Sequence, residues 1–397
     1  MNLDEPDLTE LITTPDRDAF FTALAAGPPV RRARYLDGTR VWLITGYAEA
    51  RSALSDPRFS SDGERAGVLD VGATAGIPED IRPYLMNTLG AYDPPDHTRL
   101  RNLAAKAFTA RRVARLRPHI ERICASLLDG LDEEAEFIED FAYPFPIQVI
   151  CELLGVPDTD RDIWRSAAVD LTAPDPTRIA TGARTLVAYM RDLITTKRAN
   201  PADDLISALV TARDDAGDRL SDTETVALSL SMLIAGHETT VALIASSMLH
   251  LLAEPDLLDR LRNHPEQIPA AVEEFLRHSG PAEIAVMRYT TETVRFGDVD
   301  IPEGQAVQIA YAAANHDPRR FDAADSLDIT RPDNPHLGFG HGIHYCLGAA
   351  LARAETEIAL TGLLIRFPRI EATIPTEEVG LRPGLMRMPA TLPLRLR

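Results

Sequence analysis

Apolar residues recur along most of the chain with the spacing of an amphipathic helix. We expect long helices near residues 99–131, 177–199 and 221–254. The last of these begins with Ser-Asp-Thr-Glu, the pattern of a capping box, and stays apolar on every side for about eight turns. Because a helix without a polar face is buried, residues 221–254 are expected to run through the centre of the molecule.

Strand-like segments with alternating apolar residues are shorter and occur in two places. Residues 30–46 have the pattern of a hairpin that turns at Asp37-Gly38, and residues 286–314 contain further strands and turns. No repeat, low-complexity tract or linker-like change of composition divides the chain. The sequence therefore predicts one mainly α-helical domain over residues 1–397, with a large helical lobe and a smaller β-rich lobe.

The composition is that of a soluble globular protein, with 45% hydrophobic and 25% charged residues in a chain of 397. The formal net charge of −19 argues against nucleic acid or an anionic membrane surface as a general partner. The acidic N-terminal segment lacks the basic and apolar regions of a signal peptide, and no uninterrupted apolar run reaches the ~20 residues of a membrane span. We therefore expect a cytoplasmic protein that binds neither nucleic acid nor a membrane.

The three cysteines, Cys124, Cys151 and Cys346, are odd in number and far apart, which indicates neither a disulfide framework nor a zinc site. Cys346 lies in the glycine-rich stretch GFGHGIHYCLG, residues 338–348, directly before a segment with helical period. The amide groups at a helix N-terminus favour a thiolate there. From the residues alone three interpretations stay open: a packed cysteine, a nucleophile paired with His344, and the thiolate ligand of a metal cofactor. Haem iron needs only one protein thiolate, because the porphyrin supplies its four in-plane ligands.

The glycine-rich stretch resembles the haem-binding loop of bacterial cytochromes P450, which has the pattern F-G-x-G-x-H-x-C-x-G. Its fixed positions are filled by Phe339, Gly340, Gly342, His344, Cys346 and Gly348. The resemblance implies the cytochrome P450 fold and a haem b cofactor whose iron is bound by Cys346. It further implies that Phe339 and the amide groups after the cysteine shield and tune the sulfur. It gives His341 no role.

A second motif, AGHETT, lies inside the long apolar helix. A carboxylate buried there is unfavourable without a partner, and Thr239 alone would be explained by a bond to the carbonyl four residues earlier. A zinc site of the HExxH type is excluded because Val241 stands where its second histidine would be. The cytochrome P450 resemblance implies that the helix opens near Ala235 and Gly236 beside the haem. Glu238 as acid and Thr239 as alcohol would then deliver the protons that the cleavage of dioxygen requires.

The motif EEFLR contains Glu274 and Arg277, three residues apart, a spacing that by itself is typical of a solvated helix face. In cytochromes P450 the E-x-x-R pair is a buried ion pair that supports the cysteine loop, with a third partner that corresponds to Arg331. Leu327 stands where the family has phenylalanine in F-D-x-x-R, and we expect from this only a change in packing. The resemblance gives these residues a structural role, not a catalytic one.

The motif DPPDHTRLR places His97 and Arg101 one helical turn apart. Read alone, it is a helix start in which Asp96 caps the helix and both side chains are solvated. The resemblance implies instead that His97 and Arg101 bind the haem propionates. Arg288 and His344 would complete the set, since two buried carboxylates need several charged donors.

No reductase-like segment accompanies these motifs, so the electrons have to come from another protein. The resemblance implies NAD(P)H as their source, passed on by a ferredoxin reductase and a ferredoxin. Because ferredoxins are acidic, docking needs basic side chains, which the stretch 106–119 supplies. These are Lys106, Arg111, Arg112, Arg115 and Arg117. A solvated helix face is the alternative interpretation of each of them. The protein is expected to be a monomer.

Small or aliphatic side chains are the candidates for the substrate pocket, and they suggest a roomy apolar cavity unless they only pack in the core. They are Met86, Leu89, Leu233, Ala235, Ala285, Val286 and Met386. The segments 71–90 and 165–180 are expected to contribute to the pocket walls. Glu283 and Arg387 are candidates for contacts with a polar substituent, such as an amino sugar or a carboxylate, and a solvated side chain is the equal alternative for each.

The chain as a whole is similar to actinomycete cytochromes P450 that hydroxylate or epoxidise macrolides and other polyketides in antibiotic biosynthesis. The resemblance therefore implies a monooxygenase that inserts one oxygen atom of dioxygen into a C–H bond or an alkene of a bulky apolar small molecule. Related enzymes oxidise steroids, terpenoids and fatty acids, which remain alternative substrates. A peroxide-driven peroxygenase is a further alternative, but it would not need Glu238 and Thr239.

Overall fold

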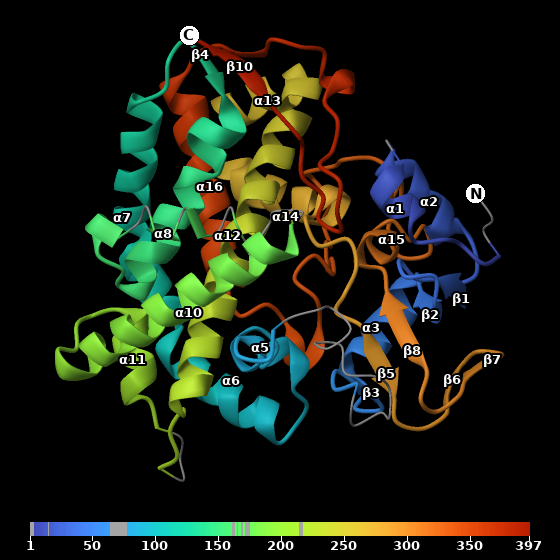
Figure 1. Ribbon diagram of the computed structural model, residues 1–397. Coiled ribbons are helices and arrows are strands. Elements are labelled where there is room, and N and C mark those ends of the chain that lie inside the picture. Colours follow the sequence, from blue (N-terminus) through green and yellow to red (C-terminus); the bar gives the residue numbers. More distant parts are fainter. Residues whose placement is uncertain are drawn as a thin grey trace. The chain divides into compact units, whose positions relative to one another are not determined.

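The computed structural model describes residues 4–14, 16–63, 78–160, 163–164, 166–167, 170, 175–213 and 217–397 (Figure 1). Two compact units make up the chain. The first consists of Met1–Val68, Cys124–Tyr143 and Thr239–Arg397, and the second of Leu69–Ile123 and Pro144–Glu238. Each unit is therefore assembled from separate stretches of sequence. The expectation of one domain over the whole chain stays a prediction.

A five-stranded sheet in the first unit carries the predicted hairpin. The strand order is β1-β2-β8-β5-β3. The strands are β1 Val30–Arg34, β2 Arg40–Ile44, β3 Phe59–Ser60, β5 Arg288–Thr290 and β8 Ala306–Ile309. Strands β1 and β2 pair antiparallel, and Gly38 has a φ of 83° in the turn between them, as the Asp-Gly pair predicts. Strand β8 lies parallel to β2 and antiparallel to β5.

Each face of this sheet is covered by its own apolar cluster, as the period of two residues in a strand requires. Val41 and Leu43 of β2 belong to a cluster with Phe20 and Phe21 of the N-terminal helix α2. Ile44 belongs to a second cluster. The later strands β6 Val294–Phe296 and β7 Val299–Ile301 form a separate hairpin. A three-stranded sheet has the order β4-β10-β9, with β4 Glu134–Glu136, β9 Ile370–Ala372 and β10 Pro393–Leu396.

The helices of the first unit precede, separate and follow these strands along the sequence. They are α1 Glu10–Thr13, α2 Arg17–Ala26, α3 Tyr47–Ser55, α13 Pro255–Asn263, α14 Ile268–Ser279, α15 Tyr311–Asn315 and α16 Ala349–Arg366. Short helical turns occupy Ile138–Ala142, Pro265–Gln267, Gly342–His344 and Thr376–Glu378. Helices α14 and α16 pack against each other, and α16 leads directly out of the cysteine loop.

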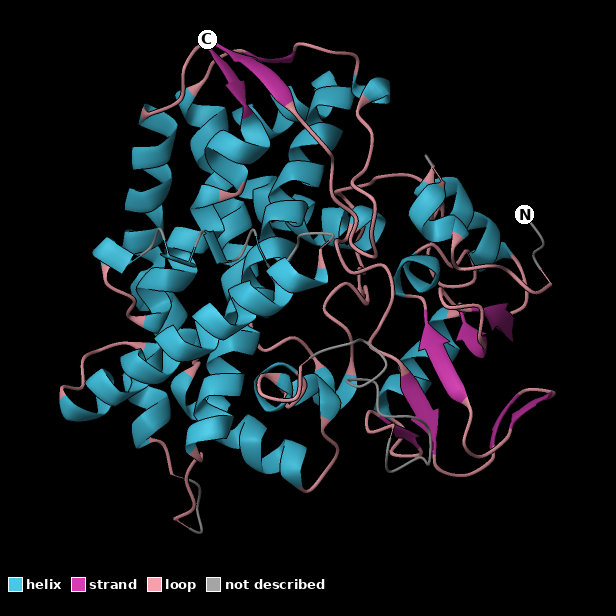
Figure 2. Ribbon diagram, in the orientation of Figure 1, coloured by secondary structure: helices cyan, strands magenta, loops and turns pink. Residues whose placement is uncertain are grey.

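The second unit is helical in its described residues (Figure 2). Its elements are α5 Arg82–Leu85, the turn Leu89–Ala91, α6 Asp96–Ala107, α7 Ala110–Asp129, α8 Pro144–Leu154, the turn Asp158–Asp160, α10 Pro176–Ala199, α11 Leu205–Thr211 and α12 Asp222–Ala253. Helix α7 ends, and helix α12 continues, in residues of the first unit. Together with the small sheets of the first unit, these helices confirm the expected mainly α-helical fold.

Helices α10 and α12 confirm the prediction from the apolar pattern to within one residue at each end. The capping box forms at the start of α12: the amide of Ser221 donates to the Glu224 carboxylate at 2.7 Å, and the amide of Glu224 donates to the Ser221 hydroxyl at 3.2 Å. The prediction of a single helix over 99–131 is wrong. The chain breaks at Phe108, and the Thr109 hydroxyl accepts a bond of 3.2 Å from the amide of Arg112, which caps the start of α7.

Helix α12 is long and apolar enough to cross a membrane by length and composition alone, with a mean hydropathy of 1.4 in its most apolar window. Of that window, 61% is buried inside the protein. Burial on this scale is typical of a helix in the core of a globular protein.

Candidate active site

The thiol of Cys346 is exposed, whereas Cys124 and Cys151 are buried. It lies three residues before α16, an 18-residue helix that begins at Ala349. The amide of Cys346 donates a hydrogen bond of 2.9 Å to the carbonyl of Phe339, which closes the loop around the glycines. The thiol is thus held beside the amide groups of a helix N-terminus, an environment that favours the thiolate.

Two glycines give the cysteine loop its path. Gly340 and Gly342 have φ values of 69° and 71°, in the left-handed region that other residues adopt with difficulty. A Cβ atom added to Gly342 would lie 2.4 Å from the carbonyl oxygen of Leu54, at the end of α3. The loop therefore touches the backbone of α3 at a distance that only glycine permits.

The ring of Phe339 is held by a side chain of helix α16. The Arg353 guanidinium lies 4.5 Å from the centre of the Phe339 ring, a cation–π contact. Arg353 also donates to both carboxylate oxygens of Glu273 on α14, at 2.5 and 2.8 Å. Burial raises the pKa of Glu273, but the bonds from Arg353 and His336 outweigh it and bring the pKa to about 2. Sequence reasoning missed Arg353, because 80 residues separate it from Glu273 and no local pattern marks the pair.

Tyr311 is another residue that the motifs did not indicate. Its hydroxyl lies 3.2 Å from the position that a Cβ of Gly340 would take. Burial raises the pKa of Tyr311, the charge of Arg288 opposes this, and the charge of Cys346 raises it further. Tyr311 therefore lies within electrostatic reach of both Arg288 and Cys346.

The four candidate propionate ligands fall on both units. Arg288 is 4% exposed in strand β5, and the His344 Nε2 atom lies 3.1 Å from the hydroxyl of Ser61. These three residues belong to the first unit. In the second unit, His97 and Arg101 lie one turn apart on α6, with His97 only 2% exposed. Ser61 was not predicted, since a lone serine far from the motif carries no signal.

His341, which the resemblance left without a role, is bonded to helix α3. The Arg51 Nε atom donates to His341 Nε2 at 3.3 Å. Burial and the Arg51 charge lower the pKa of His341. His341 thus accepts this bond as a neutral imidazole, and it fixes the cysteine loop to α3.

The E-x-x-R motif forms a buried network. Arg277 donates to both carboxylate oxygens of Glu274 at 2.7 and 2.8 Å, and neither side chain is exposed by more than 1%. Arg331 approaches Glu274 to 3.4 Å. Arg277 also donates to the carbonyls of Asn315 and Ala324, at 3.0 and 2.7 Å. The structure thus brings the three predicted partners together and ties α14 to the chain that leads into the cysteine loop.

The AGHETT motif lies in the middle of α12. The helix is continuous from Asp222 to Ala253, so the opening expected near Ala235 and Gly236 does not interrupt it. A helix can bend or widen at one turn and remain helical. Ala235 and Glu238 are exposed or half-buried, and Thr239, four residues after Ala235, shares its face of the helix.

The comparisons with known proteins agree with these features. The family model of cytochrome P450 matches residues 177–373. The chain is 41% identical to 6-deoxyerythronolide B hydroxylase of Saccharopolyspora erythraea over 385 residues, which cover 95% of both chains. It is 43% identical to vitamin D(3) 25-hydroxylase of Pseudonocardia autotrophica over 382 residues, which cover 94% of this chain and 93% of the relative. The solved structure of the tirandamycin C-bound P450 monooxygenase TamI has a TM-score of 0.87 and 40% identity, covering 98% of this chain and all of TamI.

The chain belongs to the cytochrome P450 family. The predicted family and fold are confirmed, and the protein is a monooxygenase that uses haem iron. The residues of the first unit fit haem: an exposed thiol at a helix N-terminus suits the iron, and the cationic Arg288 and the imidazole of His344 suit carboxylates.

Several candidate substrate residues of this P450 have the exposure of lining residues and others do not. Val286 is 61% exposed, and Met86, Leu89 and Met386 are partly buried. Ala285 is 7% exposed because it packs in the core beside the sheet. In the second unit Leu233 is only 3% exposed, whereas the next residue, Ile234, is 40% exposed. Of the expected wall segments, residues 71–77, 165, 168–169 and 171–174 lie outside the described residues.

The expectation that Glu283 and Arg387 contact substrate is wrong. Glu283 is 1% exposed and pairs with Arg17 at 2.6 Å. Arg387 donates to both carboxylate oxygens of Asp18 at 2.6 and 2.7 Å. Burial raises the pKa of Glu283 to about 7 although Arg17 and Arg387 lower it. Glu283 and Arg387 are thus paired with Arg17 and Asp18 inside the first unit, so they do not present their charges to a substrate's polar substituent.

The basic stretch of α6 and α7 also differs from the expectation of an open docking surface. Arg112 is largely buried, donates to the carbonyl of Asp204 at 2.8 Å and pairs with Asp203 at 3.1 Å. Lys106 donates to the carbonyl of Arg213, and Arg117 pairs with Glu121. Arg115 is exposed and lies 3.5 Å from Asp203. Arg111 is exposed. Arg112 is therefore a structural residue, and the cationic surface in this stretch is centred on Arg111 and Arg115.

Proposed function

We propose that this P450 hydroxylates or epoxidises a macrolide or another bulky apolar polyketide in antibiotic biosynthesis. The observation that carries the proposal is the exposed Cys346 thiol at the start of α16, inside a complete haem-loop motif. The substrate class rests on relatives: one acts on 6-deoxyerythronolide B, by its name, and another was solved with tirandamycin C bound. Exposed aliphatic side chains such as Val286 and Ile234 suit a large apolar ligand.

Cys346 would hold the haem through its iron, and the bound haem supplies the activation of dioxygen. The carbonyl of Phe339 accepts the Cys346 amide, and the Phe339 ring would cover the sulfur against water. Arg288 and His344, together with His97 and Arg101, would bind the propionates through charge-assisted hydrogen bonds. Gly348 borders the sulfur, since a Cβ there would lie 3.9 Å from it, an ordinary contact distance.

Glu238 and Thr239 would move protons. The Thr239 hydroxyl, on the same face of α12 as Ala235, would pass its proton to the reacting oxygen, and Glu238 would replace that proton on the hydroxyl with one taken from solvent. Thr239→Ala and Glu238→Gln should each lower the yield of hydroxylated product per NAD(P)H at least several-fold while the haem spectrum stays normal. Product formation that stays fully coupled in both variants would remove this relay from the mechanism.

Substrate contacts would come from exposed or half-buried apolar residues. We propose Met86, Leu89, Ala235, Val286 and Met386 for this role. Ile234 would take the place of the buried Leu233, and the buried Ala285 would contribute its backbone only. Val286→Trp should weaken the binding of a large substrate and leave the carbon monoxide spectrum unchanged. Unchanged binding by a Val286→Trp variant would exclude this part of the pocket.

Electrons would reach the haem from NAD(P)H through a ferredoxin reductase and a ferredoxin. An acidic ferredoxin would dock on cationic side chains, for which Arg111 and Arg115 are exposed. We further propose that the protein acts in the cytoplasm as a monomer. Its net charge of −19 argues against nucleic acid or an anionic membrane as a partner.

A second substrate class, the steroids, has one specific observation in its favour: the relative named vitamin D(3) 25-hydroxylase is 43% identical to this chain. Spin-state titration of the purified enzyme with macrolide aglycones, steroids and fatty acids separates these classes. We expect a macrolide aglycone to give the lowest dissociation constant in the low-to-high-spin titration. Mass spectrometry should then find a product 16 Da heavier than the substrate. A preference for steroids would replace the polyketide assignment and leave the monooxygenase standing.

A further inference from the structure

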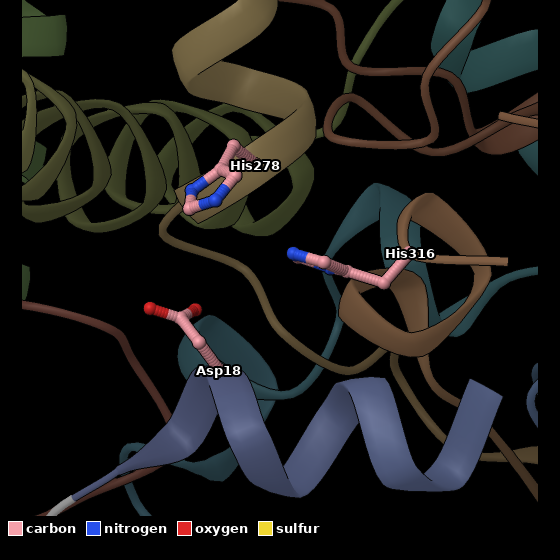
Figure 3. Close-up of side chains that lie close together, drawn as sticks. All are labelled: Asp18, His278 and His316. Carbon is pink, nitrogen blue, oxygen red and sulfur yellow. The ribbon is translucent and has the colours of Figure 1, made fainter. Parts of the chain in front are cut away.

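Three potential metal ligands converge in the first unit (Figure 3). Asp18 comes from α2, His278 from the last turn of α14, and His316 directly follows α15. One carboxylate oxygen and one nitrogen of each histidine lie within 4.8 Å of one another. Figure 3 shows the two imidazoles and the carboxylate directed toward a common space.

Hydrogen bonds to backbone carbonyls fix which nitrogen of each imidazole carries the proton. His316 Nδ1 lies 2.8 Å from the carbonyl of Ala312, and His278 Nε2 lies 3.1 Å from the carbonyl of Asp325. A carbonyl only accepts, so these nitrogens donate. A backbone carbonyl on the outer nitrogen is the arrangement that orients histidine ligands in metal sites.

The opposite nitrogens, His316 Nε2 and His278 Nδ1, are buried and have no hydrogen-bond partner among the described residues. His316 is only 2% exposed, so water does not satisfy this lone pair from bulk solvent. Buried polar atoms are nearly always paired, and an unpaired one calls for an explanation such as an ion. Two such atoms belong to the two histidines that converge with the Asp18 carboxylate, which points to a shared ligand that accepts lone pairs.

The imidazoles are suited to a metal because burial keeps them neutral. Burial lowers the pKa of His316 to about 4, and it also lowers the pKa of His278. A metal binds the neutral imidazole, so no proton has to be displaced near neutral pH. The carboxylate of Asp18 is held by the two bonds from Arg387, which leave it lone pairs for an ion.

We propose that Asp18, His278 and His316 bind a divalent transition-metal ion, for which zinc is the expected choice. Two imidazoles and one carboxylate are a zinc ligand set that leaves one position for water. A cavity of about 10 Å³ lies beside two of the three ligands, Asp18 and His278, and Glu283 also lines it. Zinc bonds of about 2.0–2.2 Å require the three side chains to close in by about an ångström.

The proposed ion would join three helices that are distant in the sequence. It would link α2 to α14 and α15, directly beside Arg277 of the E-x-x-R network. Its role would be to stabilise this part of the first unit, independently of the substrate and of the redox partner. The proposal goes beyond the monooxygenase reaction and does not depend on it.

The test uses the haem-loaded enzyme, treated with a chelator and then dialysed against zinc. Elemental analysis should find one zinc per chain beside one haem iron, and zinc-edge X-ray absorption should show two imidazoles and oxygen ligands. His278→Gln, His316→Gln and Asp18→Asn should each weaken zinc binding about 100-fold and leave the carbon monoxide spectrum unchanged. His264→Gln is the control, because His264 is an exposed histidine beside Glu266 and should leave the bound zinc in place.

Equal zinc binding by wild type and the three variants would overturn the proposal, as would zinc-edge spectra without imidazole. Failure of the wild-type enzyme to retain zinc at micromolar concentrations would also overturn it. If a variant fails to fold, the absorption spectrum of the wild-type protein decides the question by its ligand set.

Discussion

The guanidinium of Arg353 on α16 donates two hydrogen bonds, of 2.5 and 2.8 Å, to the carboxylate of Glu273 on α14. The same guanidinium lies against the ring of Phe339. One arginine therefore links the helix of the E-x-x-R motif, the helix after the cysteine and the aromatic residue of the haem loop. Replacing it should affect stability and the environment of the thiolate together.

Arg353→Gln is expected to lower the free energy of unfolding by about 1–2 kcal/mol, since the pair is partly exposed and partly screened. It should also shift the haem reduction potential, because Phe339 loses the cation that holds its ring. Chemical denaturation and redox titration of the haem-loaded enzyme measure the two effects. Arg369→Gln, which removes a surface arginine paired with Glu371, is the matched control. A potential equal to that of wild type would separate Arg353 from the haem loop.

The stabilisation by Glu273 should depend on pH in a defined direction. Its pKa in the folded protein is about 2, below the ordinary value of 4.5. A depressed pKa stabilises the folded state above pH 4.5, and this contribution is lost as the pH falls from 4.5 toward 2. The difference in unfolding free energy between wild type and Glu273→Gln should therefore shrink between pH 6 and pH 3.5. A constant difference would mean that the lost contact is packing and not charge.

Glu355 should have the opposite dependence. It is 2% exposed in α16, and burial raises its pKa well above 4.5. A raised carboxyl pKa destabilises the folded state progressively as the pH rises above 4.5. Glu355→Gln should consequently raise the melting temperature more at pH 8 than at pH 5. Thermal scans at the two pH values test this, and a variant that is equally or more destabilised at pH 8 would contradict it.

Gly342→Ala should disrupt the cysteine loop. The added Cβ would meet the Leu54 carbonyl at 2.4 Å, and the φ of 71° adds strain of roughly 1–3 kcal/mol. We expect less haem per chain and a smaller carbon monoxide band at the position of thiolate ligation. Gly380→Ala is the control, because nothing lies within 4 Å of its added Cβ. Normal haem content in Gly342→Ala would show that α3 and the loop can separate without loss of the cofactor.

Arg111→Glu should weaken the docking of an acidic ferredoxin. The KM for ferredoxin is expected to rise several-fold at low ionic strength and to approach the wild-type value in high salt, because salt screens exposed charges. Turnover driven by peroxide should not change. Arg295→Glu on the β6–β7 hairpin makes the same change of net charge and controls for it. If ferredoxin-driven and peroxide-driven turnover fell equally, the Arg111 substitution would have disturbed folding and not docking.

Contiguous motifs allowed most of the candidate site to be predicted from the sequence. Cys346, Phe339 and the glycines between them fall within one short stretch, and the periodicity of α10 and α12 is strong because each is long. The break between α6 and α7 was missed because Phe108 and Thr109 fit the apolar pattern, and only the cap on Thr109 reveals it. The apolar pattern identifies long helices, while an N-cap decides where a new helix begins.

Contacts between distant residues were not predictable in the same way. The pairs Glu283–Arg17 and Asp18–Arg387 join positions more than 260 residues apart. An isolated acid and an isolated base give no sign of each other, so Glu283 and Arg387 were interpreted as ligand contacts or as solvated side chains, and not as members of ion pairs. The same limitation hid Tyr311 and Ser61, whose neighbours in space lie in other elements.

The unequal exposure of the cysteines has a practical consequence. Cys124 and Cys151 are enclosed in the core, so a water-soluble thiol reagent meets Cys346 alone while the native fold persists. Coordination to iron would take that sulfur out of reaction. The molar ratio of labelled thiol to protein then gives the fraction of chains that lack haem. The haem content of a preparation can therefore be measured without its absorption spectrum.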